Sequence, residues 1–247
     1  PKAVFLIFLF FPHYLLAAGI YTSFIGSYRN ATVPVIPELV AADGKTAQVG
    51  FGSGVLLRYD RGEKVYEFLA TAKHLLENAN QIKILYTRAP LPGDFPNRSL
   101  IREETYVLEK GNRRFWATPK DDKVDLAVVF IREWKSKEEL SKAVEHAEKE
   151  YQAGSTNNVI VQNFHLPFQK GTAIEDIDSI DQLFDVVILG FPLGLVSRYA
   201  ANPIVRSGTI ALPSLRGVQD YHPEAFLIEG TVWPGNSGGP VILRKTY

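Results

Sequence analysis

Short apolar runs separated by turn residues dominate the 247-residue chain from about residue 48 onward. Gly, Pro, Asp or Asn bound these runs, and several alternate apolar with polar positions, which is typical of β-strands. The expected strands cover residues 48–57, 65–70, 81–86, 104–108, 113–117, 124–131, 159–164, 185–190, 204–212 and 225–228. Residues 89–97 contain three prolines and are expected to form a loop. The pattern predicts an all-β chain.

One segment has the periodicity of a helix. Within residues 136–151, apolar side chains recur at helical spacing and Glu and Lys fill the other positions. Ser136 followed by Glu139 forms a capping box at the start. We expect an amphipathic helix here, a solvated connector between two β domains.

The N-terminal residues are almost entirely apolar. Residues 3–11 are uninterrupted apolar, and the run resumes over residues 14–21 after Pro12 and His13. A signal peptide, a membrane anchor and an apolar arm packed on the domain all remain open. The first two place the rest of the chain outside the cytoplasm, and an anchor would associate residues 3–21 with a membrane.

The pattern divides the chain into four parts. Residues 1–25 are the apolar signal peptide or anchor, 26–134 a linker and first β-barrel, 135–155 the connecting helix, and 156–247 a second β-barrel. We expect residues 26–48 to be the linker, because two prolines interrupt them.

Composition excludes several classes of protein. The 27 basic and 27 acidic residues cancel, so the chain lacks the basic footprint of nucleic-acid-binding proteins. The absence of cysteine excludes a disulfide framework. We expect neither a cofactor nor a metal.

A glycine-rich loop around Ser237 carries candidate chemistry. Residues 230–240 read Gly-Thr-Val-Trp-Pro-Gly-Asn-Ser-Gly-Gly-Pro. A serine nucleophile needs a base, an orienting acid and donors for the oxyanion, and the amides of Gly235 and Ser237 can supply those donors. Taken alone, the loop is more typical of a hairpin turn.

Two upstream segments change this interpretation. Thr71-Ala72-Lys73-His74 follows an expected strand, and Asp125 begins the apolar run Asp-Leu-Ala-Val-Val. With Gly52-Ser53-Gly54, the stretch Gly-Phe-Pro-Leu-Gly at 190–194 and Gly-Asn-Ser-Gly-Gly-Pro at 235–240, they resemble the trypsin/chymotrypsin-like serine proteases, most closely the cysteine-free HtrA (Deg) branch. The five motifs occur in the family's order and span about residues 50 to 242.

The order of the motifs excludes the main competitor. Residues 235–239 also fit the G-x-S-x-G elbow of α/β-hydrolases, in which the acid and the histidine follow the serine. Only ten residues follow Ser237, and none is Asp, Glu or His.

The resemblance implies a fold and a set of site residues. The fold would be two six-stranded antiparallel β-barrels with the site between them, the second barrel incomplete because the chain is part of a longer polypeptide. His74 would be the general base, Asp125 its orienting acid and Ser237 the nucleophile, and the amides of Gly235 and Ser237 would form the oxyanion hole. Thr231 would lie at the base of the substrate pocket.

Other residues are weaker candidates for these roles. His165 and His222 lie outside the matching motif, and Asp121 and Asp122 lie in a polar turn beside lysines. Lys73 is expected to point away from the site, since successive strand side chains face opposite sides.

The resemblance also implies a function. Uncharged Thr231 disfavours cleavage after Lys or Arg and favours small or medium apolar residues. Asn236 replaces the aspartate of the trypsin-like activation switch, so loops, partners or homo-oligomerisation are expected to order the site. We expect a serine endopeptidase acting on polypeptides in extracytoplasmic quality control or processing. The alternative is a catalytically silent binding or chaperone-like module on the same fold.

Overall fold

The structure is a computed structural model that describes residues 26–87, 100–152, 165–167, 182–197, 200–216, 218 and 225–244. Its largest element is a nine-stranded sheet in the order β6-β5-β1-β3-β4-β10-β9, with β2 paired to β1 and β11 paired to β3. The strands are β1 (Thr32–Val40), β2 (Thr46–Gln48), β3 (Gly52–Arg61), β4 (Lys64–Thr71), β5 (Gln81–Thr87), β6 (Ile101–Val107), β9 (Trp116–Ala117), β10 (Ala127–Trp134) and β11 (Leu166–Pro167).

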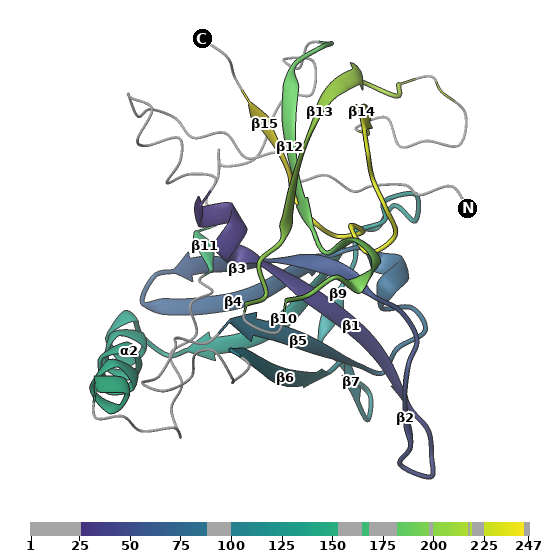
Figure 1. Cartoon of the computed structure of the whole chain (residues 1–247). Coiled ribbons are helices and arrows are strands. Elements are labelled where there is room, and N and C mark those ends of the chain that lie inside the picture. The colour runs from purple at the N-terminus through teal and green to yellow at the C-terminus, as the bar shows by residue number, and fades with distance from the viewer. Residues whose placement is uncertain are drawn as a thin grey trace.

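A second, four-stranded sheet has the order β14-β13-β12-β15 and stands above the first (Figure 1). Its strands are β12 (Asp185–Gly190), β13 (Ile204–Leu212), β14 (Leu227–Gly230) and β15 (Val241–Arg244). A small hairpin pairs β7 (Glu109–Lys110) with β8 (Arg113–Arg114), and two short 3-10 helices, η1 (Lys73–Leu75) and η3 (Pro192–Gly194), follow β4 and β12.

The predicted all-β class is confirmed, and the strand pairs are antiparallel except for β11 with β3. The strand numbers differ from the prediction of two six-stranded barrels, the second of them incomplete, and no closed barrel is found among the described residues. In the described residues the sheets have nine and four strands, and β6 and β9 end the larger one without pairing to each other. The first sheet has more strands than predicted partly because it includes β1 and β11, which the sequence pattern did not assign to it.

The expected linker at residues 26–48 is wrong, because β1 lies inside the first sheet. Residues 32–35 of β1 pair with β3 and residues 35–38 pair with β5, so each of the two prolines lies outside one ladder. Pro34 lies beyond the ladder with β5, and Pro37 lies beyond the ladder with β3, where its carbonyl accepts from the Val49 amide. A proline has no N–H to donate, and at these positions none is required.

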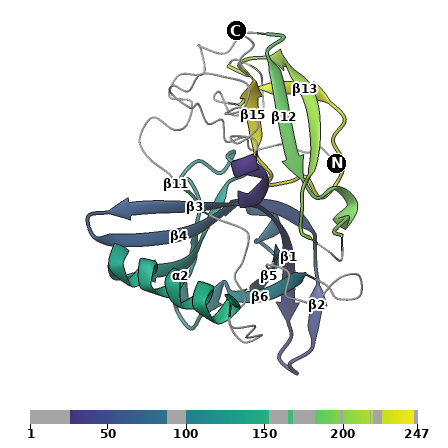
Figure 2. The same ribbon diagram turned by 60° about the vertical axis from the view of Figure 1, so that its left-hand side comes forward.

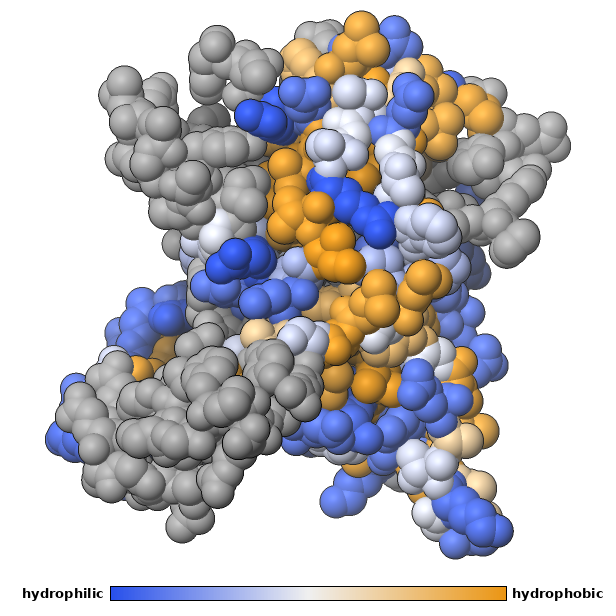
Figure 3. Space-filling view, in the orientation of Figure 1, coloured by the Kyte–Doolittle hydropathy of each residue, from blue (hydrophilic) through white to orange (hydrophobic). Residues whose placement is uncertain are grey.

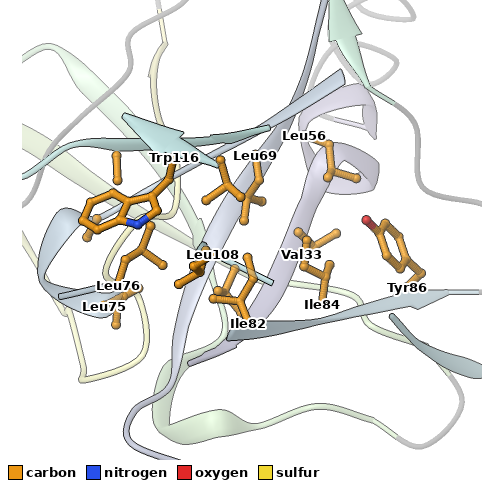
Figure 4. Close-up of a cluster of buried hydrophobic side chains, with 14 residues drawn as sticks. Val33, Leu56, Leu69, Leu75, Leu76, Ile82, Ile84, Tyr86, Leu108 and Trp116 are labelled. Carbon is orange, nitrogen blue, oxygen red and sulfur yellow. The ribbon is translucent and has the colours of Figure 1, made fainter. Parts of the chain in front are cut away.

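Two of the four apolar clusters among the described residues hold the first sheet and join it to the second. The first fills the nine-stranded sheet, and Figure 4 shows Val33, Leu56, Leu69, Ile82 and Ile84 converging on one another. The second joins the sheets, because Val55 and Ala70 of the first pack with Leu189 and Ile242 of the second. These four side chains are at most 1 % exposed, so the two sheets share a dry contact.

The predicted helix is present as α2 (Lys137–Gln152), which lies beside β4 and β10 (Figure 2). The Glu139 amide donates to Ser136 Oγ at 3.1 Å, and the Glu139 carboxylate accepts from the Lys135 amide at 2.7 Å. Ser136 therefore caps the helix as expected, although the returning bond of Glu139 reaches one residue further back.

Several sequence predictions lie outside the described residues: the apolar segment 1–25, the loop at 89–97 and the strand at 159–164. Residues 26–31 are helical and lead directly into β1. Within the described part of the chain, no helix is both long and apolar enough to span a bilayer.

Candidate active site

Strand register brings His74 and Asp125 to the same edge of the first sheet. Thr71, the last residue of β4, pairs with Gly54 of β3 on one side and with Ala127 of β10 on the other. His74 follows Thr71 in η1, and Asp125 lies just before Ala127. Because β4 and β10 are antiparallel, the end of one meets the start of the other.

The carboxylate of Asp125 holds His74 by two hydrogen bonds. Oδ2 lies 2.6 Å from His74 Nδ1, and Oδ1 accepts from the His74 amide at 2.9 Å. The Asp125 side chain is 17 % exposed and that of His74 is 48 % exposed, so the acid is shielded while the ring reaches solvent. With Nδ1–H donated to the carboxylate, the neutral ring leaves its Nε2 as an acceptor.

The same contact raises the pKa of His74. The hydrogen bond to Asp125 is the main cause, because it favours the protonated ring, and partial burial opposes it by disfavouring the charge. The nearby carboxylates of Asp125 and Glu77 add smaller effects in the raising direction. The ring is therefore a stronger base than a free histidine.

The rival residues take no part in this contact. The Asp122 side chain is fully exposed, and Asp121 accepts from the Lys123 amide within its own turn. Lys73 lies in η1, not in a strand as expected, and its Nζ lies 3.8 Å from both Glu77 and Asp122.

The competing histidines lie elsewhere. His165 Nδ1 is 3.7 Å from Glu67, a residue in the middle of β4, and burial lowers the pKa of His165. His222 lies outside the described residues.

The loop that carries Ser237 connects β14 to β15 and docks on the edge that holds His74. The Ser237 carbonyl accepts from the Ser53 amide at 2.8 Å. At Gly238, with φ +83°, an added Cβ would lie 2.2 Å from the Ser53 carbonyl oxygen and 2.8 Å from the Ala72 nitrogen. Glycine is therefore required for the loop to approach β3 and β4.

The structure thus brings the three motifs together to different degrees. His74 and Asp125 are hydrogen-bonded, and the backbone of Ser237 packs next to the segment that leads into His74. Among the hydrogen bonds of the described residues, none joins the Ser237 hydroxyl to His74. The Ser237 side chain is half-buried.

Among the backbone amides of the loop that have no acceptor in the described part of the protein are those of Gly235 and Ser237. Gly235 adopts φ +97°, and the carbonyl before it, that of Pro234, accepts from the Leu193 amide at 2.6 Å. Because N–H and C=O of a trans peptide point in opposite directions, the Gly235 N–H points away from Leu193. Neither of the two predicted oxyanion donors is therefore committed to an acceptor among the described residues.

The remaining predicted positions surround this loop. Thr231 is exposed, and its carbonyl accepts from Arg206 Nη1 at 2.8 Å. Asn236 is 3 % exposed, and its Nδ2 has no hydrogen-bond partner among the described residues. The hydrogen bond to the Thr231 carbonyl places the cation of Arg206 next to Thr231.

Exposed apolar side chains gather beside the serine loop. Leu193 is 61 % exposed and Trp233 is 47 % exposed, and the hydrogen bond from Leu193 to Pro234 ties their two segments together. In Figure 3 apolar surface runs along the junction of the upper and lower halves of the molecule.

Sequence reasoning gave no role to the residues that hold the serine loop in place. Ser53 and Phe191 lie in two of the five matching motifs, and both are fully buried. The available signal was a serine between two glycines in a buried strand, because a buried hydroxyl needs hydrogen-bond partners. Nothing in the sequence indicated which partners these are.

The described residues offer no group of three His, Asp or Glu side chains placed to hold a metal ion.

Comparison with known proteins gives one kind of match. No family model matches the chain, and no curated protein does. Among solved structures, the chain is similar to an HtrA-type protease, AlgW, determined as a variant with a tripeptide, with 16 % sequence identity and a TM-score of 0.46. The match covers 90 % of this chain and 50 % of that one, so the chain spans about half its length.

Proposed function

We propose that this protein is a serine endopeptidase of the trypsin-like type, in which His74, Asp125 and Ser237 form the triad. The observation that carries the proposal is the paired contact of Asp125 with His74, 2.6 Å to Nδ1 and 2.9 Å to the amide, at the edge where the Ser237 loop docks. An acid that fixes the ring tautomer is what a base for a serine hydroxyl requires.

The chemistry follows from these positions. Ser237 Oγ attacks the carbonyl carbon of a peptide bond while His74 Nε2 takes the hydroxyl proton. The amides of Gly235 and Ser237 bind the oxyanion that forms. His74 then returns the proton to the leaving amine as the C–N bond breaks. Water, deprotonated by His74, attacks the acyl group and releases Ser237.

The missing Ser237–His74 hydrogen bond is compatible with this assignment. Catalytic hydrogen bonds are often long before substrate binds and tighten in the complex. The close approach of the loop backbone to Ser53 and to the segment before His74 supports the assignment.

The missing Ser237–His74 hydrogen bond also favours a second candidate, a catalytically silent binding module on this fold. A fluorophosphonate probe separates the two, because it reacts only with an activated serine. We expect wild-type protein to be labelled on a peptide containing Ser237, with labelling lost in Ser237→Ala and His74→Ala. Labelling that persists in Ser237→Ala, or its complete absence in the wild type, would support the silent module.

The setting and substrate of the enzyme are part of the proposal. The apolar residues 3–21 support an extracytoplasmic location, and the exposed Leu193 and Trp233 beside the site support apolar side chains in the substrate. Digestion of a peptide library should give cleavage after small or medium apolar residues and none after Lys or Arg. Sedimentation at several concentrations tests whether the active form is a homo-oligomer.

A further inference from the structure

We propose that Ser53 is a positioning residue for this hydrolysis: its buried hydroxyl locks the peptide groups around Gly235, so that the Gly235 amide is held ready for the oxyanion. The inference rests on the proposed function. It is carried by four hydrogen bonds of one residue that reaches no solvent.

Every polar group of Ser53 is used, and the four partners lie in three segments: the serine loop, β4 and the start of η3. Its Oγ donates to the Gly235 carbonyl at 2.7 Å and accepts from the Phe191 amide at 3.0 Å. Its amide donates to the Ser237 carbonyl at 2.8 Å, and its carbonyl accepts from Thr71 Oγ1 at 2.7 Å. Ser53 is 0 % exposed, so water cannot replace any of these partners.

These bonds fix the two peptide planes on either side of Gly235. The Leu193 amide holds the plane before it through the Pro234 carbonyl, at 2.6 Å. Ser53 Oγ holds the plane after it through the Gly235 carbonyl. A glycine can otherwise rotate through conformations closed to other residues, including those in which its N–H turns away from a substrate. Fixing both planes leaves Gly235 one conformation, with φ +97°.

The second partner of the hydroxyl is itself anchored. The Phe191 side chain is fully buried and packs with Leu85 of β5 and with Ala201. The Phe191 amide therefore has a fixed position relative to the first sheet, and it directs the hydroxyl proton of Ser53 toward the Gly235 carbonyl. Through this chain of contacts, β3 and β5 of the first sheet position the Gly235 amide, which lies in a loop of the second sheet.

The test compares Ser53→Ala with Thr32→Val in the full chain. Thr32 is also 0 % exposed and donates its hydroxyl to the carbonyl of Tyr28, in the helix before β1, so it controls for loss of a buried hydroxyl away from the site. We expect Ser53→Ala to lower kcat about 10- to 100-fold with KM within about twofold, which is less than the roughly 10²–10³ of losing an oxyanion donor. Thr32→Val should leave kcat unchanged.

Two further measurements separate positioning from general damage. Affinity for a peptide boronic acid, which mimics the oxyanion, should fall in Ser53→Ala by the same factor as kcat/KM. The pH profile should keep its inflection, because the His74–Asp125 contact is untouched. An unchanged kcat in Ser53→Ala would overturn the inference. So would a rise in KM and a shift of the pH inflection in Ser53→Ala, if Thr32→Val shows the same changes.

The outcome is distinguishable from failure of the proposed function. If the wild type is labelled by fluorophosphonate and Ser53→Ala behaves like it, the inference alone is wrong. If the wild type is not labelled, the function is wrong and the catalytic role of Ser53 falls with it. Hydrogen exchange at the Phe191 and Gly235 amides then still tells whether Ser53 locks the loop, since Ser53→Ala should accelerate exchange at Phe191 and Thr32→Val should not.

Discussion

The proposed acid–base pair and the proposed nucleophile are held by different kinds of structure. His74 and Asp125 lie at the ends of neighbouring strands of one sheet, where the register of Thr71 with Ala127 alone brings them together. Ser237 belongs to the other sheet and reaches the first only through close backbone contacts of its loop. The pair is therefore assembled by a continuous ladder, and the nucleophile by an interface between sheets. Alignment of Ser237 with His74 therefore depends on the interface between the two sheets.

The largest expected effect comes from breaking the pair itself. Asp125→Asn keeps the size of the side chain but can donate to Nδ1, which favours the wrong ring tautomer. We expect kcat/KM to fall about 10⁴-fold with little change in unfolding temperature. Asp122→Asn, at a fully exposed carboxylate in the same turn, is the control and should match the wild type. A loss of less than tenfold in Asp125→Asn would remove Asp125 from the triad.

The next effect comes from forcing the interface apart. In Gly238→Ala, the new Cβ meets the carbonyl of Ser53 at 2.2 Å at φ +83°, so the loop must move. A displacement of about 1 Å is enough to lower kcat/KM about 10²-fold. Gly111→Ala is matched in backbone, with φ +60°, but has nothing within 4 Å, and should cost only about 1 kcal/mol of stability. Equal activity in both variants would show that the contact does not align Ser237.

A smaller effect concerns the pH dependence of the pair. Because the hydrogen bond to Asp125 raises the pKa of His74, kcat/KM should rise with an inflection above 6.5, the ordinary pKa of histidine. Protonated His74 stabilises the fold below pH 6.5, and this contribution is lost as the pH rises through the raised pKa. Activity should therefore appear as that stabilisation disappears. The measurements are rates and unfolding temperatures between about pH 5 and 9, and an inflection below 6.5 contradicts the assignment.

The smallest effect on activity is expected far from the interface. Ser136→Ala removes the cap of α2, which should cost about 1 kcal/mol in chemical denaturation. Since strand register and not α2 places His74, kcat/KM should not change. A fall in activity of the folded variant would mean that the helix also supports the pair.

The sequence predicted those features that local pattern encodes. Strands 185–190 and 204–212 agree with β12 and β13, because each is a single apolar or alternating run between turn residues. The motifs around His74 and Asp125 were assigned correctly to the ends of two strands. The helix cap at Ser136 was also evident, since its partners lie within four residues.

What the sequence did not reveal depends on contacts between distant segments. The prolines of β1 indicated a linker, and only the staggered pairing with β3 and β5 explains why they are tolerated in a strand. The role of Ser53 depends on partners 138 and 182 residues away. No local pattern tells which of the buried hydroxyls in a β protein reaches such partners.

The shared apolar contact formed by Val55, Ala70, Leu189 and Ile242 has a consequence for how the protein loses activity. It joins two sheets that each keep their own ladder of hydrogen bonds, so a mild solvent perturbation can separate them before either melts. In rising urea, reaction of Ser237 with its probe should then cease while the circular dichroism of the strands persists, and the inactivation should reverse as soon as the denaturant is diluted.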